Sequence, residues 1–402
     1  MTADRRAVLA GLGAGLALGV AAPVLAAPLS GVWRIELDHP GGPLPFGLEV
    51  SADGRKAWIL NPPERLAVEK VEQRGKTLVL AFPSYGSEIL LEPDGAGLKG
   101  SARLVRRSGP VVLAAKGSRG NWRFSPKPGS PAAAAGRWAV GSGSGPATGV
   151  GQFRAQGPLL AGSIQFPSGD TRYLSGEVTG GQLKLSTFDG NTTGLWLGRI
   201  EGNRIVGEQW SATSRQPAAW TATRAPDAAA SAVAVEQVTP VPIRLAFPDS
   251  SGRIVSLSDP QYRGKVVLVS IGGAWCPNCH DEARFLGSYA AKRRKDGLEV
   301  VGLQFEYGDD RARAFRQLDS FKSRYALPYP LLLAGQPTPE STRAALPVIG
   351  GVKVYPTTLL IDRKGRLREV HVGWAGPATG KLHQQVVTEL DAAVGRLLKE
   401  QA

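Results

Sequence analysis

The chain contains two cysteines, and both fall in the segment Trp275-Cys276-Pro277-Asn278-Cys279. A pair at this spacing can cycle between a dithiol and a disulfide, so thiol–disulfide exchange is the first chemistry to consider. The segment follows a buried apolar run and opens a helical pattern, which places Cys276 at the amino terminus of a helix. Unsatisfied N–H groups and the helix dipole stabilise a thiolate there. We therefore expect Cys276 to be the more acidic and more exposed thiol, and the nucleophile.

The second cysteine has the spacing of a resolving thiol. Cys279 lies three residues after Cys276, on the same face of the predicted helix, where it can attack a mixed disulfide and release the partner. Pro277 suits the first helical turn, where its missing N–H is not needed. About 80 residues later, Tyr355-Pro356-Thr357-Thr358 stands just before a strand, and an X-Pro bond in that position suits the cis form.

The elements that must hold these residues form an alternating pattern in the last third of the chain. Continuous apolar runs predict buried strands, and apolar residues at helical spacing predict amphipathic helices. The expected order is a βαβ unit followed by a ββα unit. The strands are expected at 265–271, 298–305, 357–362 and 367–372, and the helices at 277–294, 310–324 and 381–399.

On these motifs, residues 241–402 resemble the TlpA-like branch of the thioredoxin fold. The segments 264–286 and 354–367, together with the final helix, carry the resemblance. It implies reduction of disulfides in periplasmic protein partners, with the Cys276–Cys279 pair as the redox centre and no other cofactor. A thiol electron donor in the membrane would also be needed, because the compartment is oxidising. The residues 271–274 depart from the branch, which usually has an aromatic and small polar residues there.

The resemblance also assigns roles to single residues. Glu282, three positions after the second cysteine, is expected to assist proton transfer. Pro356 is expected to be cis and to pack beside the cysteines, with its flanking backbone pairing with the substrate chain. The side chains expected near the substrate are Trp275, Pro277, Asn278, Tyr355 and Thr357.

The 402 residues suggest two or three domains, and the first two thirds look like a duplicated β module. Residues 27–125 and 136–224 each contain a Gly-x-Trp opening, short alternating runs and a closing tryptophan segment, around Trp122 and Trp220. The fold class is therefore multidomain: two small antiparallel barrels or sandwiches, then an α/β thioredoxin-like domain. An Ala/Pro-rich linker at 225–240 would let the modules swing relative to the dithiol. We expect the modules to bind or position a partner; a ligand-carrying barrel beside a vestigial redox domain is the alternative.

The amino terminus reads as an export signal. Arg5-Arg6 precede an apolar run, and small residues at 24–26 offer a cleavage site, so residues 1–26 resemble a twin-arginine signal peptide. The alternative is an uncleaved membrane anchor. A cleaved signal predicts a periplasmic protein.

Other function classes are weaker. The net charge of +14 is spread along the chain, which disfavours nucleic-acid binding. Cys276-x-x-Cys279-His280 also fits the c-type haem attachment pattern, but Pro277 and the preceding buried strand disfavour it. In the thioredoxin-like interpretation His280 is a surface residue of the first helical turn. Bound metal is not expected, because no second ligand pair follows at useful spacing. A disulfide oxidase remains the alternative within the redox class.

Two further groups of polar residues stand out. Glu306 and Tyr307 end a strand on the side of the sheet where α/β proteins bind ligands, so a role near the dithiol is one interpretation and a surface position the other. In the second β module, Asp170 or Asp189 is expected to pair with Arg172 for structural reasons.

Overall fold

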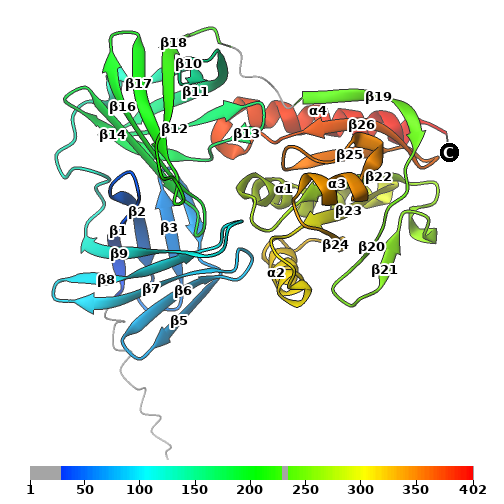
Figure 1. Cartoon of the computed structure of the whole chain (residues 1–402), viewed down its shortest axis with the longest axis horizontal. Coiled ribbons are helices and arrows are strands. Elements are labelled where there is room, and N and C mark those ends of the chain that lie inside the picture. Colours follow the sequence, from blue (N-terminus) through cyan, green and yellow to red (C-terminus); the bar gives the residue numbers. More distant parts are fainter. Residues whose placement is uncertain (1–28, 229–233, 402) are drawn as a thin grey trace, which may run out of the picture.

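The computed structural model describes residues 29–228 and 234–401, so the proposed signal peptide at 1–26 lies outside the described residues. Two β modules lie on one side of the molecule and an α/β domain on the other (Figure 1). Within the described ranges, no helix is both long and apolar enough to cross a membrane. This arrangement confirms the expected fold class.

The first module is an open antiparallel sheet of nine strands in the order β4-β3-β2-β1-β9-β8-β7-β6-β5. Its core is made by inward-facing apolar residues such as Ile35, Phe46 and Leu80, which are fully or almost fully buried. The strands are β1 Gly31–Leu37, β2 Leu44–Val50, β3 Ala57–Asn61, β4 Glu64–Ala67, β5 Lys70–Arg74, β6 Thr77–Phe82, β7 Ser87–Asp94, β8 Gly97–Leu104 and β9 Val111–Arg119.

The second module is a closed barrel, because its sheet order β11-β10-β18-β17-β16-β15-β14-β12-β13 is joined by a further β11–β12 pairing. Closure removes the free strand edges that the first module keeps. The strands are β10 Gly136–Ser142, β11 Ala147–Gln156, β12 Leu159–Phe166, β13 Gly169–Asp170, β14 Leu174–Thr179, β15 Gln182–Phe188, β16 Thr193–Glu201, β17 Arg204–Trp210 and β18 Ala218–Arg224.

The two modules share a device that supports the duplication. In each, the tryptophan of the Gly-x-Trp opening is buried, and its indole N–H donates to the carbonyl four residues earlier. An arginine from the last strand lies over the ring, at 3.7 Å for Arg119 over Trp33 and 4.3 Å for Arg224 over Trp138. The register is the same in both, since each arginine pairs with its tryptophan across the sheet.

This register corrects the expected match between Trp122 and Trp220. Trp220 lies in β18 and is buried in the barrel core, whereas Trp122 comes after β9 ends and is half-buried. The Gly-x-Trp openings align correctly, but the strand end equivalent to Arg224 is Arg119. A tryptophan near the end of a module does not identify equivalent strands, because the neighbouring sequence reveals neither its burial nor its strand pairing.

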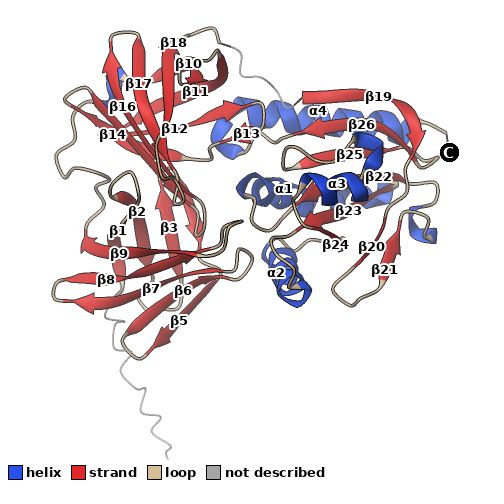
Figure 2. Ribbon diagram, in the orientation of Figure 1, coloured by secondary structure: helices blue, strands red, loops and turns tan. Residues whose placement is uncertain are grey.

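The α/β domain is built on a six-stranded mixed sheet of order β19-β26-β25-β22-β23-β24 (Figure 2). Strands β22, β23 and β24 are parallel, and β25, β26 and β19 are antiparallel to their neighbours. The strands are β19 Ala234–Pro242, β22 Val266–Gly272, β23 Leu298–Phe305, β24 Leu331–Gly335, β25 Thr357–Ile361 and β26 Arg366–Val372, with a separate hairpin of β20 Ala246–Pro248 and β21 Ile254–Ser256.

Four helices complete this domain: α1 Pro277–Arg293, α2 Arg311–Arg324, α3 Pro339–Ala345 and α4 Lys381–Lys399. Apolar residues of α1, α2 and α4 share one core cluster with one face of the sheet. The other face packs against residues that include Leu245, Val255 and Leu346, from the hairpin region and the end of α3. Every residue of β22 is buried, as a central strand covered on both faces requires.

The expected linker at 225–240 needs correction, because part of it belongs to this sheet. β19 pairs with β26 as an edge strand, from Ala234 opposite Val372 to Pro242 opposite Arg366. Its side chains are almost all exposed. The sequence therefore lacks the apolar alternation of a strand. Backbone pairing with β26 holds most of the segment in place, and Val238 packs partly against the core of the domain.

Candidate redox site

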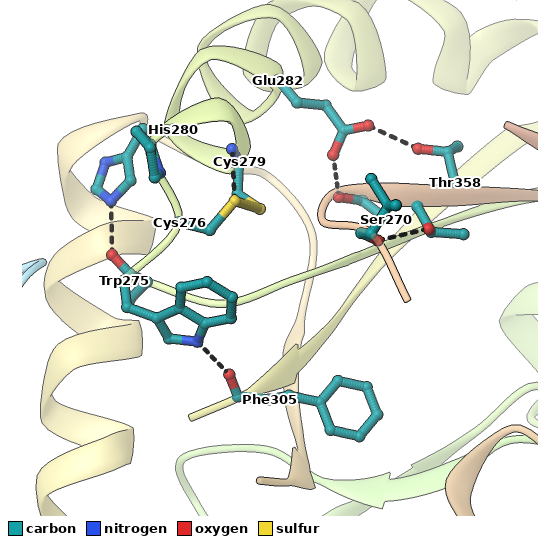
Figure 3. The surroundings of a disulfide bond; sticks show 12 residues. Ser270, Trp275, Cys276, Cys279, His280, Glu282, Phe305 and Thr358 are labelled. Carbon is teal, nitrogen blue, oxygen red and sulfur yellow. Dashed lines mark hydrogen bonds between the residues drawn. A yellow bond between two sulfur atoms is a disulfide. The ribbon is translucent and has the colours of Figure 1, made fainter. Parts of the chain in front are cut away.

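The two cysteines lie at the junction between β22 and the start of α1. Cys276 is the N-cap of α1, and its sulfur accepts the Cys279 N–H at 3.2 Å. The pair forms a disulfide with its Cα atoms 5.2 Å apart (Figure 3). In this state Cys276 and Cys279 are only 3% and 4% exposed. Both residues are thus buried in the disulfide state. The expected order of exposure and acidity concerns the two thiols of the reduced protein and stays a prediction.

An aromatic cluster stands in front of the disulfide. The Trp275 indole donates to the Phe305 carbonyl at 2.8 Å, stacks on Tyr307 at 4.8 Å and meets Tyr355 edge-on at 5.2 Å. The Tyr355–Pro356 peptide bond is cis. Trp275 therefore connects the turn at the cysteines to the loop before β25. Tyr307 lies at the site, which agrees with one of the two interpretations offered for it from the sequence.

Glycine at position 273 explains the departure at 271–274. A side chain there would collide with the Trp275 ring and with the Phe305 carbonyl. The small residues let the indole fold back over the strand end. The turn is held further by Glu306, which accepts the Ala274 N–H at 2.6 Å. Burial raises the pKa of Glu306 to about 8, so it is largely protonated at neutral pH.

Glu282 is buried on the other side of the disulfide. Its carboxylate accepts the Ser270 and Thr358 hydroxyls, each at 2.6 Å, from β22 and β25 (Figure 3). Burial raises its pKa, and the two hydroxyl donors partly oppose the rise. Thr357 donates its hydroxyl to the Val354 carbonyl at 2.8 Å, which shapes the loop around Pro356.

His280 is buried, which corrects its expected surface position. Its Nε2 lies 2.7 Å from the Ala274 carbonyl and its Nδ1 lies 2.8 Å from the Tyr325 hydroxyl. A carbonyl can only accept, so Nε2 carries the proton and Nδ1 accepts from tyrosine. Burial lowers the pKa of His280 well below its usual value. Both ring nitrogens are engaged, so this histidine is not free to bind haem iron.

The face of His280 is covered by the first β module. The Tyr85 ring stacks on the imidazole at 4.0 Å, and its hydroxyl donates to Asp189 at 2.8 Å. The sequence contains no signal for this contact, because Tyr85 follows β6 in a loop of another module. Nearby, Arg324 of α2 pairs with Glu69 at 2.7 Å.

Arg172 of the second module binds to the first turns of α1. Its guanidinium donates to the Pro277 carbonyl at 3.1 Å and pairs with Asp281 at 3.0 Å and Glu64 at 2.7 Å. All three charged side chains are less than a tenth exposed. Arg172 was expected to form a side-chain pair with Asp170 or Asp189, but it pairs with Glu64 and Asp281 instead. Its role is therefore to connect the β modules to the α/β domain.

Asn278 faces the same module and not an open substrate surface. When the side-chain amide of Asn278 is oriented with its oxygen toward the Asp170 N–H, that oxygen accepts the N–H at 3.1 Å. The amide nitrogen then donates to the Asp170 carbonyl at 3.3 Å. Asp170 also accepts the Gly376 N–H of the α/β domain. These contacts fix the modules against α1, so the arrangement differs from the swinging one that the sequence suggested.

The described residues hold no group of three or more histidine, cysteine, aspartate or glutamate side chains arranged to bind a metal. The Cys276–Cys279 pair itself is present as a disulfide. The buried Glu282 and His280 belong to the same helix as Cys279.

Comparison with known proteins agrees with this geometry. Residues 235–370 match the model of the AhpC/TSA family. The domain is 34% identical over 139 residues to the thiol:disulfide interchange protein DsbE of Escherichia coli (strain K12), which covers 34% of this chain and 66% of that protein. It is 28% identical over 142 residues to the thiol-disulfide oxidoreductase ResA of Geobacillus thermodenitrificans, covering 35% and 71%.

The chain thus spans about two thirds of the length of these curated relatives. A crystal structure of a putative thiol:disulfide interchange protein DsbE from Chlorobium tepidum is 25% identical, with a TM-score of 0.29, and covers 39% of this chain and 99% of that chain. By sequence, this part of the chain is similar to proteins named for thiol–disulfide exchange, and it carries a CxxC-spaced pair at the start of α1.

Proposed function

We propose that this protein is an exported thiol–disulfide oxidoreductase that reduces disulfides in periplasmic protein partners. The observation that carries the proposal is the Cys276–Cys279 pair at the start of α1, with Trp275 linking it to the cis-proline loop. The relatives named for thiol–disulfide exchange support the reaction class. The pattern at 1–26 supports export.

The reaction runs between the dithiol and a partner disulfide. The Cys276 thiolate attacks one partner sulfur, forms a mixed disulfide and displaces the other partner sulfur, which takes up a proton. Cys279 then loses its proton and attacks the Cys276 sulfur, which releases the second partner thiol. Two electrons have moved to the partner, and the protein is left with the intramolecular disulfide. A thiol donor of the membrane restores the dithiol.

Glu282 is the proposed acceptor of the Cys279 proton. Its burial keeps the carboxyl pKa raised, which brings it closer to that of a thiol. The hydroxyls of Ser270 and Thr358 hold the carboxyl in one orientation. In this proposal Pro356 and the adjoining Thr357 present backbone to the substrate chain, while Trp275 and Tyr355 form the wall beside it.

The β modules are proposed to position the partner. Tyr85 and Arg172 pack on the first turns of α1, so the modules form a fixed frame around the dithiol. The alternative of a ligand-carrying barrel requires an open interior. The barrel core instead contains the buried rings of Trp138, Phe153 and Trp220.

Redox titration tests the direction of the reaction. A reductase should have a standard potential near that of thioredoxin, about −270 mV, whereas an oxidase should lie near about −120 mV. The purified mature protein is equilibrated in glutathione or dithiothreitol buffers, and the dithiol fraction is counted by alkylation and mass spectrometry. A Cys276→Ser variant is the control that should show no two-electron transition. A potential near about −120 mV would reverse the proposed direction.

A further inference from the structure

A groove of about 540 Å³ opens beside the redox site, on the side of the Trp275 ring. Its inner wall is aromatic, because Trp275, Tyr307 and Tyr355 all line it. Trp275 precedes Cys276 in the chain, so a segment in the groove lies against the neighbour of the proposed nucleophile, while Cys276 itself does not line the groove. Such a position suits the residues that flank a partner cysteine.

The outer wall is cationic. The groove is lined by Arg107, Arg343 and Lys353, and none of its lining residues is acidic. Arg107 and Lys353 are exposed and make no ion pair with any residue in the described ranges. Arg343 approaches Glu340 at 3.7 Å, but both side chains are more than half exposed, so that pair is weak.

One of these cations comes from the first β module and not from the α/β domain. Arg107 lies in the turn between β8 and β9. Burial raises the pKa of Tyr355 to about 12, and the nearby charge of Arg107 partly opposes that rise. The turn is anchored to the second module: the Asn191 carbonyl accepts from Arg106 at 2.8 Å, and the Asn191 side chain accepts the Val105 N–H at 2.8 Å. Arg107 is therefore held over the groove by both modules together.

We propose that this groove binds an acidic segment of the protein whose disulfide is being reduced, with Arg107 as a specificity-determining residue. The inference deepens the proposed reductase function and rests on it. Carboxylates beside the partner cysteine would face three cations, while apolar parts of the same segment would pack on the aromatic wall. The β modules would thus select partners at the dithiol itself.

Matched peptide disulfides test the proposal. Two peptides of equal length carry one intramolecular disulfide, flanked by glutamates in one and by lysines in the other. The mature full-length protein is first reduced with dithiothreitol and freed of it. Reduction of each peptide is then followed by chromatography under single-turnover conditions. We expect the acidic peptide to be reduced at least about fivefold faster at low salt, and the preference to shrink at 1 M salt, where the Debye length falls to about 3 Å.

Variants then locate the preference. Arg107→Glu should reduce the ratio of acidic to basic peptide rates by on the order of tenfold, because one attraction becomes a repulsion. Arg107→Lys should keep most of the ratio. Lys76→Glu is the matched control, since it makes the same charge change at an exposed position in the β5–β6 turn of the same module.

The outcomes separate the two proposals. Equal rates for both peptides, or a preference that Arg107→Glu leaves intact, would overturn the role of the groove. The uncharged 2-hydroxyethyl disulfide is run alongside with the wild-type protein. If the reduced protein transfers electrons to neither peptide nor to this small disulfide, the reductase function itself is refuted.

Discussion

Replacing Arg172 by methionine should separate the β modules from the α/β domain. Methionine keeps most of the length of the side chain and removes its charge and all its donors. Asp281 and Glu64 then remain buried without their cation, and the Pro277 carbonyl loses a donor. Breaking a buried ion pair by removing one partner costs about 3–5 kcal/mol, so we expect a loss in that range.

The free energy of unfolding is measured by urea titration, with far-UV circular dichroism and tryptophan fluorescence as two probes. We expect the midpoint to fall and the two probes to stop coinciding, because the domains lose a buried charged contact between them. Arg199→Met is the matched control. Arg199 pairs with Glu201 at 3.0 Å, but the side chains are 67% and 47% exposed, so its loss should change stability by less than about 0.5 kcal/mol.

A double-mutant cycle with Asp281→Asn tests the reasoning directly. When Asp281 is replaced by asparagine, removing Arg172 leaves only the Glu64 carboxylate buried without its cation. The double variant should therefore lose less than the sum of the single variants, by about 1–3 kcal/mol. Additive effects, or an Arg172→Met protein as stable as wild type, would show that this ion pair does not hold the domains together.

Three further results are expected. In the reduced protein, Cys276 should react with iodoacetamide faster than Cys279 near neutral pH, because it caps α1; faster modification of Cys279, located by peptide mapping, would contradict the nucleophile assignment. Glu282→Gln should slow peptide reduction about 100-fold or more at pH 7 and remove one inflection from the pH–rate profile; an unchanged profile would exclude the proton-transfer role. Burial raises the pKa of Asp170 from 3.8 to about 7, so between these pH values the folded state binds one more proton than the unfolded state, and its stability falls as the pH rises. Asp170→Asn should remove this part of the pH dependence of the urea midpoint. The same pH dependence in the variant and the wild type would argue against this assignment.

The sequence by itself determined the redox centre and the elements that carry it. The helix start at Cys276, the buried strand before it and the Tyr355-Pro356 position all depend on neighbouring residues, so local patterns were sufficient. The strands at 266–272 and 298–305 and the helix at 381–399 lie within a residue or so of their expected positions. The duplicated Gly-x-Trp openings were readable for the same reason, since each is a short motif with its own packing role.

Tertiary structure alone decided the surroundings of that centre. Tyr85 of another module stacks on His280 and helps to bury it, and Arg172 reaches the Pro277 carbonyl across 105 positions of sequence. Arg107 lines the groove only because Asn191 anchors its turn. No periodicity or spacing records such contacts, since each depends on how separately folded modules pack. For the same physical reason β19 looked like a linker: an exposed edge strand is held by backbone hydrogen bonds, which leave little trace in side-chain composition.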